Sequence, residues 1–205
     1  MLNIIIPDFD GFFSLGLRIF IQDFICETDY RTVNFLSEFS EANVASADLI
    51  FIELASGEKY LCHELFKVRK KHSMLIGVND ADGGKVFRSL PLCFKGMIFI
   101  SHKIKIEKIK IILNSFIASV SGEISFQGCY SCGPCQYRAF SRQQLNIAAG
   151  LYRGESVSDI AAGLNISPKT VSAHKRIMMT KFDLNTNQEL HLLLDRMWDH
   201  SSGMG

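Results

Sequence analysis

The sequence contains no apolar run as long as the roughly 18 residues that a membrane-spanning helix requires. Residues 1–8 carry no basic segment ahead of an apolar one, and they therefore lack the pattern of a secretory signal peptide. Neither sign of charge dominates, since 22 Lys and Arg residues oppose 21 Asp and Glu residues, for a net charge of +1. These absences predict a cytoplasmic chain with no membrane partner. They leave nucleic-acid binding open, because a near-neutral total can contain a small cationic face.

Three common sequence motifs for catalysis are also missing. The glycines before Lys85 lack the spacing and the hydroxyl residue of a phosphate-binding P-loop. No pattern of a Ser–His–Asp triad or of a zinc protease is present. We therefore expect that the chain is not an enzyme and that it uses no cofactor.

Apolar, β-rich runs alternate with helical patterns through the first 120 residues. Strands are predicted over residues 2–6, 30–35, 49–52, 74–78 and 97–100, and helices over residues 11–24, 58–71 and 104–120. Continuous apolar strands separated by helices indicate a parallel sheet that is covered on both faces. With right-handed crossovers, this order predicts an α/β domain with a flavodoxin-like, doubly wound fold and a site at the carboxyl ends of its strands.

This layout resembles the receiver domain of two-component response regulators. The resemblance implies an acidic loop for magnesium after the first strand, a phosphoacceptor aspartate after the third, a hydroxyl after the fourth and a lysine after the fifth. Here Asp8 and Asp10 occupy the acidic loop, and Glu53 stands at the phosphoacceptor position. Asn79 falls near the hydroxyl position and Ile100 near the lysine position.

We interpret this domain as a degenerate receiver that is not phosphorylated in the usual way. Glu53 supplies a permanent negative charge, but it has neither the geometry nor the additional charge of a phosphoryl group. Two interpretations stay open: the domain is held in a state that resembles the active one, or its pocket has become purely structural.

Residues 121–139 interrupt the alternation with a segment that contains Gly and Pro, which indicates a linker between a domain at 1–120 and a second at 140–205. The linker holds Cys129, Cys132 and Cys135 in the spacing C-x2-C-x2-C. Reduced thiols are expected in the cytosol. A metal or iron–sulfur site, a redox sensor and thiols without a role all remain open, although no fourth metal ligand lies nearby in sequence.

Two further observations concern the cysteines. The segment Cys132-Gly133-Pro134-Cys135 matches the thioredoxin active-site tetrapeptide, but it follows a predicted helix rather than a strand, which argues against thiol-exchange catalysis. Three other cysteines lie in apolar or helical contexts and are predicted to be packing residues: Cys26, Cys62 and Cys93.

From Phe140 onward, the sequence contains four helical segments. Ser141, Ser156 and Ser167 are suitable N-cap residues for the first three, and Pro168 stands at the first helical position of the third. The helices are predicted to run to residues 153, 164 and 182, and the fourth from 186 to 198. The side chains expected to face inward are Leu145, Ile147, Ala148, Leu151, Val157, Ile160, Ala161, Leu164, Val171, Ile177, Phe182, Leu190, Leu193, Leu194 and Met197.

The third helix of this group is strongly basic. It contains His174 and no acidic residue, and its cations are Lys169, Lys175, Arg176 and Lys181. A capped, cationic helix is suited to phosphate contact and to entry into a DNA groove. Ser172 and Ala173 are small enough for the backbone to approach base edges, and Arg176 is able to pair with guanine through two hydrogen bonds.

The combined spacing over residues 140–198 resembles the LuxR/NarL-type helix-turn-helix. The resemblance rests on Phe140-Ser141-Arg142, on the segments 154–161 and 164–175, and on Lys181-Phe182. It implies dimerisation through the last helix, around residues 188–192. It also implies that Ser172, Ala173 and Arg176 face bases and that four residues contact the DNA backbone: Lys169, Thr170, His174 and Lys181. Lys175 completes the predicted DNA-binding set.

Two departures from the family pattern stand out. Gln143-Gln144 replace a frequent Arg-Glu pair, and Ser172 replaces a frequent lysine. The pairing of Ser141-Arg142 with residues 170–175 is similar to auxiliary regulators of the RcsA type, which form heterodimers with a response regulator.

The sequence therefore predicts a sequence-specific DNA-binding transcriptional regulator that is independent of phosphorylation. Its partners are expected to be double-stranded DNA and either a second copy or a response regulator. The alternative is a regulator that senses redox state, a metal or a nucleotide messenger through the linker thiols or the receiver-like pocket.

Overall fold

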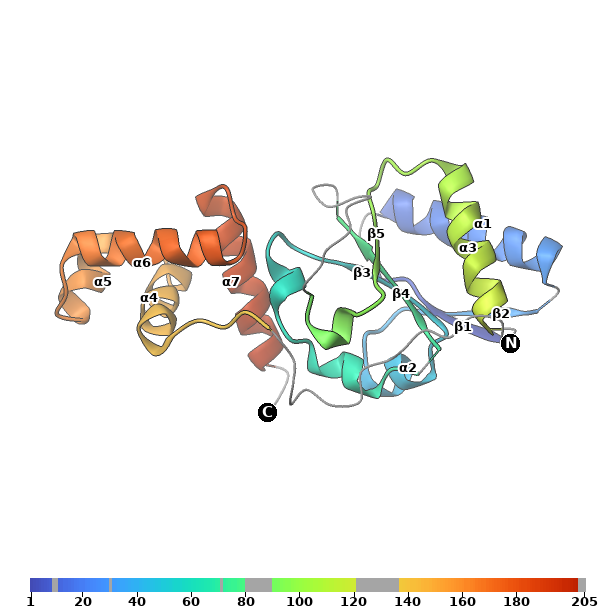
Figure 1. Ribbon diagram of the computed structural model, residues 1–205, viewed down its shortest axis with the longest axis horizontal. Coiled ribbons are helices and arrows are strands. Elements are labelled where there is room, and N and C mark those ends of the chain that lie inside the picture. The colour runs from blue at the N-terminus through green and yellow to red at the C-terminus, as the bar shows by residue number, and fades with distance from the viewer. Residues whose placement is uncertain (9–10, 30, 71, 80–89, 121–136, 203–205) are drawn as a thin grey trace. The chain divides into compact units, whose positions relative to one another are not determined.

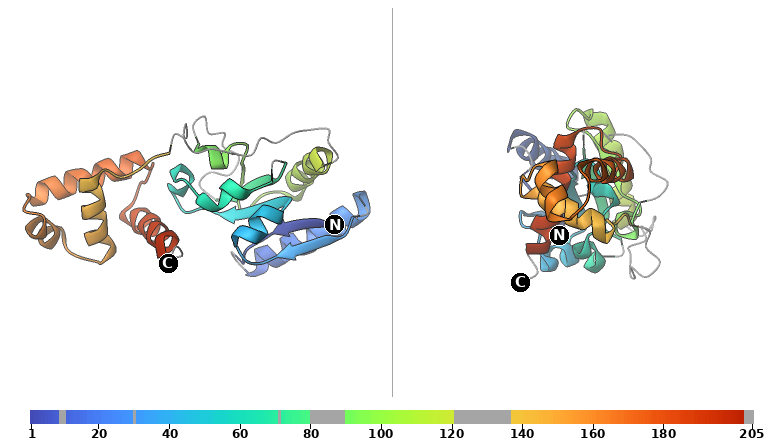
Figure 2. Two further views of the ribbon diagram at one scale, coloured as in Figure 1. Left: turned by 90° about the horizontal axis from the view of Figure 1, so that it is seen from below. Right: turned by 90° about the vertical axis from the view of Figure 1, so that its left-hand side faces the viewer.

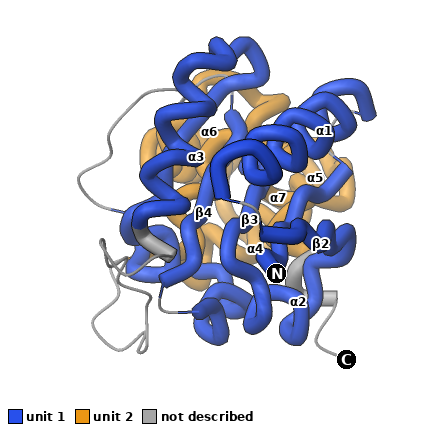
Figure 3. Tube along the Cα trace, turned by 90° about the vertical axis from the view of Figure 1, so that its right-hand side faces the viewer, with its two compact units in different colours: residues 1–54, 62–136 blue, residues 55–61, 137–205 orange. Residues whose placement is uncertain are grey.

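The computed structural model describes residues 1–8, 11–29, 31–70, 72–79, 90–120 and 137–202. The chain divides into two compact units (Figure 3). The first unit comprises Met1–Leu54 and Cys62–Gln136, and the second comprises Ala55–Leu61 and Tyr137–Gly205. The chain therefore enters the second unit twice, first for a short segment and then for its C-terminal part.

Five parallel strands form the sheet of the first unit. They are β1 (Leu2–Ile5), β2 (Val33–Leu36), β3 (Leu49–Glu53), β4 (Met74–Val78) and β5 (Ile98–Ile100). Their order is β2-β1-β3-β4-β5, and every neighbouring pair is parallel. This order confirms the predicted flavodoxin-like, doubly wound fold.

Apolar side chains of the sheet alternate between two cores. In β3, Leu49 and Phe51 lie in one core, and Ile50 and Ile52 lie in the other. Helices α1 (Gly11–Thr28) and α3 (Ile106–Val120) cover the first face (Figure 1). The second face packs against α2 (Glu41–Ser46) and the short 3-10 helices η2 (Glu64–Val68) and η3 (Leu92–Phe94). Burial on both faces explains why the strands are continuously apolar.

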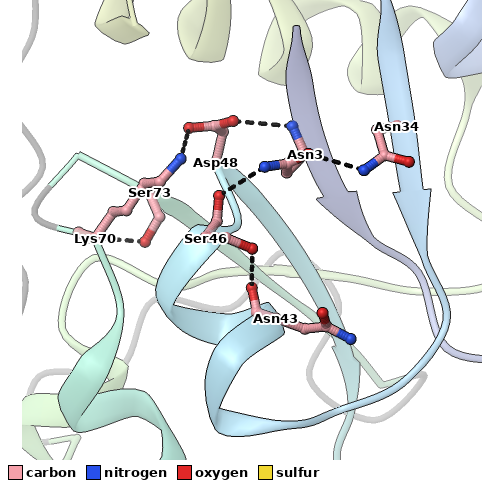
Figure 4. A network of polar contacts seen from close by, with 7 residues as sticks. All are labelled: Asn3, Asn34, Asn43, Ser46, Asp48, Lys70 and Ser73. Atoms are coloured by element: carbon pink, nitrogen blue, oxygen red, sulfur yellow. Dashed lines mark hydrogen bonds and ion pairs between the residues drawn. The ribbon is translucent and has the colours of Figure 1, made fainter.

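A polar network joins the strands at their amino ends (Figure 4). One carboxylate oxygen of Asp48 accepts a hydrogen bond from the backbone N–H of Asn3 at 2.9 Å, and the other lies 2.6 Å from the ammonium of Lys70. The side chain of Asn3 donates to the carbonyl of Ser46 at 3.1 Å and accepts from Asn34 at 3.0 Å. The network supports the register of β1, β2 and β3 at the edge opposite the predicted site.

The prediction of a single helix over residues 58–71 is wrong. The structure contains two separate 3-10 helices there, η1 (Glu58–Tyr60) and η2. Tyr60 is buried in the core of the second unit, whereas Phe66 is buried in the core of the first. The chain is extended at Leu61, between these two side chains, so no single helix runs through both.

Four helices build the second unit (Figure 2). They are α4 (Arg142–Tyr152), α5 (Val157–Gly163), α6 (Pro168–Lys181) and α7 (Asn187–Ser202). Helix α4 packs against the other three, and α5 packs against α6. This arrangement confirms the predicted all-α, four-helix domain. Within the described residues, no helix is both long and apolar enough to cross a membrane.

Two of the side chains predicted to face inward are exposed instead. Leu145 is 44% exposed and Ile177 is 51% exposed, whereas Met178 is fully buried. In α6 the buried stripe consists of Val171, Met178 and Phe182, which recur at intervals of seven and four residues. Ile177 precedes Met178 by one residue and therefore lies about 100° around the helix from that stripe.

Candidate nucleic-acid interface

Helix α6 begins with a complete cap. The hydroxyl of Ser167 accepts a hydrogen bond from the backbone N–H of Thr170 at 3.1 Å. Pro168 occupies the first turn, where its missing N–H costs no hydrogen bond. Both residues are exposed, so the positive end of the helix dipole faces outward.

A tight turn joins α5 to α6. Asn165 adopts the left-handed conformation with φ of 52°, and the N–H of Ile166 donates to the carbonyl of Ala161 at 3.0 Å. This pattern closes the end of α5 and sets the direction of α6. A Cβ added to Gly150 in α4 would lie 2.7 Å from Ile160, so glycine is needed for the close contact of α4 with α5.

The structure places the predicted DNA-contacting residues along α6. Lys169, Thr170, Ser172, Ala173 and Arg176 are exposed, and three further members are half-buried: His174, Lys175 and Lys181. The buried stripe of α6 faces the core of the second unit. The exposed face of the helix therefore carries five of the eight predicted residues, and the other three lie beside it.

The charge on this face is not neutralised by neighbouring acids. Helix α6 contains no acidic residue, and no ion pair within the described part of the chain involves Lys169, Lys175 or Arg176. The ammonium of Lys181 donates to the carbonyl of Ala139. Nδ1 of His174 is buried and has no hydrogen-bond partner among the described residues.

A capping box stabilises the start of helix α4, where this chain lacks the Arg-Glu pair that is frequent in the family. The hydroxyl of Ser141 accepts from the N–H of Gln144, and Oε1 of Gln144 accepts from the N–H of Ser141 at 3.0 Å. This reciprocal capping box satisfies two backbone donors that the helix itself leaves unpaired. Gln144 is buried, so its amide is part of the packing of the unit.

The C-terminal end of α6 is held by residues that the sequence analysis did not single out. The hydroxyl of Tyr60 donates to a carboxylate oxygen of Asp183, and the guanidinium of Arg138 lies over the Tyr60 ring. Arg138 also donates to the backbone carbonyl of Lys181. The dipeptide Ser56-Gly57 is a turn signal directly before the helical pattern predicted over residues 58–71, and it is a local sign of this arrangement.

The receiver-like positions lie at the carboxyl edge of the sheet. Glu53 ends β3 opposite Val78 of β4, and Asn79 follows β4 directly. The side-chain amide of Asn79 donates to the carbonyl of Leu54 at 2.6 Å, so it bonds to the backbone beside Glu53. Asp8 is exposed. Asp10 lies outside the described residues.

The cysteines fall into two groups. Cys129, Cys132 and Cys135 lie outside the described residues, so the metal or redox site predicted for the linker thiols lies outside them too. Cys93 is buried and Cys62 packs against the same core, which agrees with a packing role. Cys26 is exposed on α1, so its packing prediction is wrong. Among the described residues, no group of three or more His, Cys, Asp or Glu side chains is arranged to hold a metal ion.

Comparison with known proteins gives relatives for both parts of the chain. A segment of 143 residues is 25% identical to the oxygen regulatory protein NreC of Staphylococcus haemolyticus. The aligned segment covers 69% of this chain and 59% of that protein. The chain thus spans about three fifths of the length of the curated relatives it matches.

Solved structures share the fold. One is RcsB from Salmonella enterica serovar Typhimurium bound to promoter P1flhDC in the presence of the phosphomimetic BeF3−, with a TM-score of 0.57, 17% identity and coverage of 94% of this chain and 97% of that one. Another contains two RcsB dimers bound to two parallel DNAs, with a TM-score of 0.52, 18% identity and coverage of 95% and 98%.

The family comparison addresses the second unit directly. Residues 138–194 match the family described as bacterial regulatory proteins, luxR family. This description agrees with the expectation of a regulator rather than an enzyme. The matched residues include all of α4, α5 and α6 and the first half of α7, which are the elements that present the cationic face. The C-terminal part of this chain is therefore similar to the luxR family of bacterial regulatory proteins, and its helices α5 and α6 form the helix-turn-helix that its sequence predicts.

Proposed function

We propose that the chain is a sequence-specific, DNA-binding transcriptional regulator that acts in the cytoplasm. The observation that carries this proposal is the outward face of α6, whose cations Lys169, Lys175 and Arg176 are not paired with acids among the described residues. A capped helix of 14 residues with small side chains at its exposed centre has the dimensions to enter a major groove.

The residues of α6 divide into two roles. Lys169 and Thr170 in the first turn, with His174 and Lys181, contact phosphates and fix the register of the helix on the duplex. Ser172, Ala173 and Arg176 face base edges, and the guanidinium of Arg176 pairs with O6 and N7 of a guanine. Lys175 adds charge to the same face. The mechanism is equilibrium binding, and the phosphate contacts release counterions from the DNA.

The active form in this proposal is a dimer that contacts DNA through two copies of α6. Gln188 and Leu192 are exposed on α7, while Leu190, Leu193 and Leu194 are buried beneath them. An exposed leucine beside polar side chains is suited to a small protein contact. RcsB, which shares the fold, binds DNA as dimers. The partner is a second copy of this chain or a response regulator with the same type of domain.

Phosphorylation of the sheet edge plays no part in this mechanism. The phosphoacceptor position implied by the receiver resemblance holds Glu53, and the neighbouring Asn79 side chain donates to a backbone carbonyl. We assign the first unit to partner contact rather than to phosphoryl chemistry.

The test is a binding measurement with the purified full-length chain. Duplexes selected from bacterial genomic DNA by the chain itself are compared with random duplexes by fluorescence anisotropy over a range of salt concentrations. We expect a preference for the selected duplex, and a logarithm of affinity that falls with the logarithm of salt by roughly 0.9 for each phosphate contact. Equal affinity for both duplexes, or an affinity that does not respond to salt, refutes the proposal.

A further inference from the structure

The segment Ala55–Leu61 follows β3 directly in the chain, yet it belongs to the second unit (Figure 3, orange). Tyr60 is 5% exposed and lies in the same core as Phe140, Phe182 and Leu184. Glu58 is also buried; its Oε2 accepts from the N–H of Ala55 at 2.8 Å and lies 3.9 Å from Nε of Arg196 in α7. The core around α6 is therefore completed by residues outside the segment that matches the luxR family.

Tyr60 contacts the end of α6 through two neighbours. Its hydroxyl donates to Oδ2 of Asp183, and its ring lies 3.4 Å from the guanidinium carbon of Arg138. The N–H of Arg138 donates to the carbonyl of Tyr60 at 2.9 Å, and its guanidinium donates to the carbonyl of Lys181. Nη1 of Arg138 also lies 3.5 Å from Oδ1 of Asp183. We call Tyr60, Arg138 and Asp183 the clamp.

The clamp acts at the residue where the backbone turns out of α6. Asp183 has φ of 55°, in the left-handed region that L-residues other than Gly, Asn and Asp rarely adopt. This conformation closes α6, because it allows the N–H of Leu184 to donate to the carbonyl of Met179 at 2.9 Å. The hydroxyl of Tyr60 and the guanidinium of Arg138 hold the Asp183 side chain in the orientation that belongs to this turn.

Helix α6 is thus supported at each end by a different device. Its start is fixed by the Ser167 cap and by the turn at Asn165, and its end is fixed by the clamp. Between them, two side chains of the helix, Val171 and Met178, are fully buried. Groove recognition depends on the placement of the exposed side chains to within a fraction of an ångström to an ångström. Movement of the C-terminal end of α6 would therefore displace Arg176 and Lys181 from their proposed contacts with DNA.

We propose that Tyr60, Arg138 and Asp183 are positioning residues for DNA recognition by α6, which makes recognition dependent on the segment 55–61. This inference rests on the proposed function. The clamp residues do not contact DNA in this mechanism. They hold the end of the helix whose outward face does.

The experiment uses the full-length chain with Tyr60→Phe, which keeps the buried ring and its contact with Arg138 and removes only the hydroxyl. We expect the affinity for the selected duplex to fall about tenfold, because the binding-competent arrangement of α6 becomes a minor population. In hydrogen exchange without DNA, amides of residues 178–184 should exchange about tenfold faster, while those of residues 168–172 remain unchanged. Asp183→Gly, which suits the positive φ, should have the same effects, and the double variant should be no worse than either single one.

A matched control separates positioning from loss of stability. Leu190→Val truncates a fully buried side chain of α7 and destabilises the unit without touching the clamp. If Leu190→Val weakens DNA binding and speeds exchange at residues 178–184 as much as Tyr60→Phe does, the positioning role is overturned. Additive effects of Tyr60→Phe and Asp183→Gly also overturn it. If the wild-type chain binds no duplex, the proposed function fails, and the exchange measurement alone still decides whether the clamp holds the end of α6.

Discussion

The guanidinium carbon of Arg138 lies 3.4 Å from the centre of the Tyr60 ring, although the two residues come from distant parts of the chain. Such a contact between a cation and an aromatic face is worth about 0.5–2 kcal/mol, depending on how far water is excluded. Because Tyr60 is buried, the contact links the start of the luxR-type segment to the residues that follow β3. This relationship explains why the second unit is discontinuous in sequence.

Gly57 provides a test of how closely the segment 55–61 fits the second unit. Its φ is 82°, and an added Cβ would lie 2.9 Å from Leu184 and 3.0 Å from the carbonyl of Phe182. We expect Gly57→Ala to lower the free energy of unfolding by about 2–4 kcal/mol, since strain at positive φ adds to overpacking. Urea unfolding followed by the fluorescence of Trp198, the single tryptophan, reports on the second unit.

The control for this variant is Gly154→Ala in the same unit. Gly154 has φ of 77°, but nothing lies within 4 Å of an added Cβ. Gly154→Ala should therefore lower the free energy of unfolding only through the strain at positive φ, by about 1–2 kcal/mol. Equal losses for the two variants would show that the segment 55–61 does not pack against Leu184 and Phe182 in solution.

Arg176 and Lys169 should respond differently to truncation. Arg176→Ala is expected to weaken binding to the selected duplex by about 1–3 kcal/mol and to leave random DNA nearly unaffected, because in the proposed mechanism Arg176 contacts a base. Lys169→Ala should weaken binding to all duplexes alike and reduce the salt slope by about 1, because in the proposed mechanism Lys169 contacts a phosphate. Anisotropy titrations at several salt concentrations measure both effects.

The exposed Leu145 of α4 offers a reference position for these titrations, since it lies in the same unit but outside α6. Leu145→Ala should leave both duplexes bound as in the wild type. If Arg176→Ala changes neither the selected nor the random duplex, the assignment of α6 as the recognition helix is wrong.

Asp48 anchors the polar network at the amino ends of the strands. Its carboxylate accepts from the N–H of Asn3 and pairs with Lys70, and its side chain is 18% exposed. We expect Asp48→Ala to lower the free energy of unfolding by about 1–3 kcal/mol, because the N–H of Asn3 loses its acceptor. The measurement is chemical unfolding followed by circular dichroism, which reports on the strands and helices of both units, beside the fluorescence of Trp198, which reports on the second unit.

Glu64→Ala serves as the matched control for Asp48→Ala. The Glu64 carboxylate pairs with Lys67 at 2.5 Å on the surface, so its loss should change the free energy by no more than about 0.5 kcal/mol. If Asp48→Ala lowers the free energy of unfolding by no more than Glu64→Ala does, the network does not stabilise the sheet.

Acetyl phosphate with magnesium should not add a phosphoryl group to the chain. The position implied by the receiver resemblance holds Glu53, which is longer than the usual aspartate, and Ile100 ends β5 near the place of the usual lysine. Intact mass spectrometry measures the outcome, with a receiver domain that contains an aspartate as the positive control. Stoichiometric labelling of this chain would contradict the degenerate interpretation.

Local signals account for what sequence reasoning predicted correctly. The strands of the first unit are continuously apolar because the sheet is buried on both faces, and this pattern was sufficient for the order of the fold. Helix α6 was located by Ser167 and Pro168, whose effects operate within one helical turn. The cationic residues of α6 followed from composition, and the structure places them on or beside the outward face.

Non-local packing accounts for what sequence reasoning missed. Residues 58–71 have a helical pattern, but Tyr60 and Phe66 belong to different cores, and no local rule distinguishes one core from another. Leu145 and Ile177 have the spacing of inward residues, yet periodicity does not fix which side of a helix meets its neighbours.

The sequence by itself determined the class of both units, the helix-turn-helix and the charge of helix α6, because caps, periodicity and composition act over a few neighbouring residues. Only the tertiary structure decided that the segment 55–61 joins the second unit and that Tyr60 meets Arg138 and Asp183. Those contacts join residues that are far apart in the chain, and burial and hydrogen-bond geometry in the folded core select them.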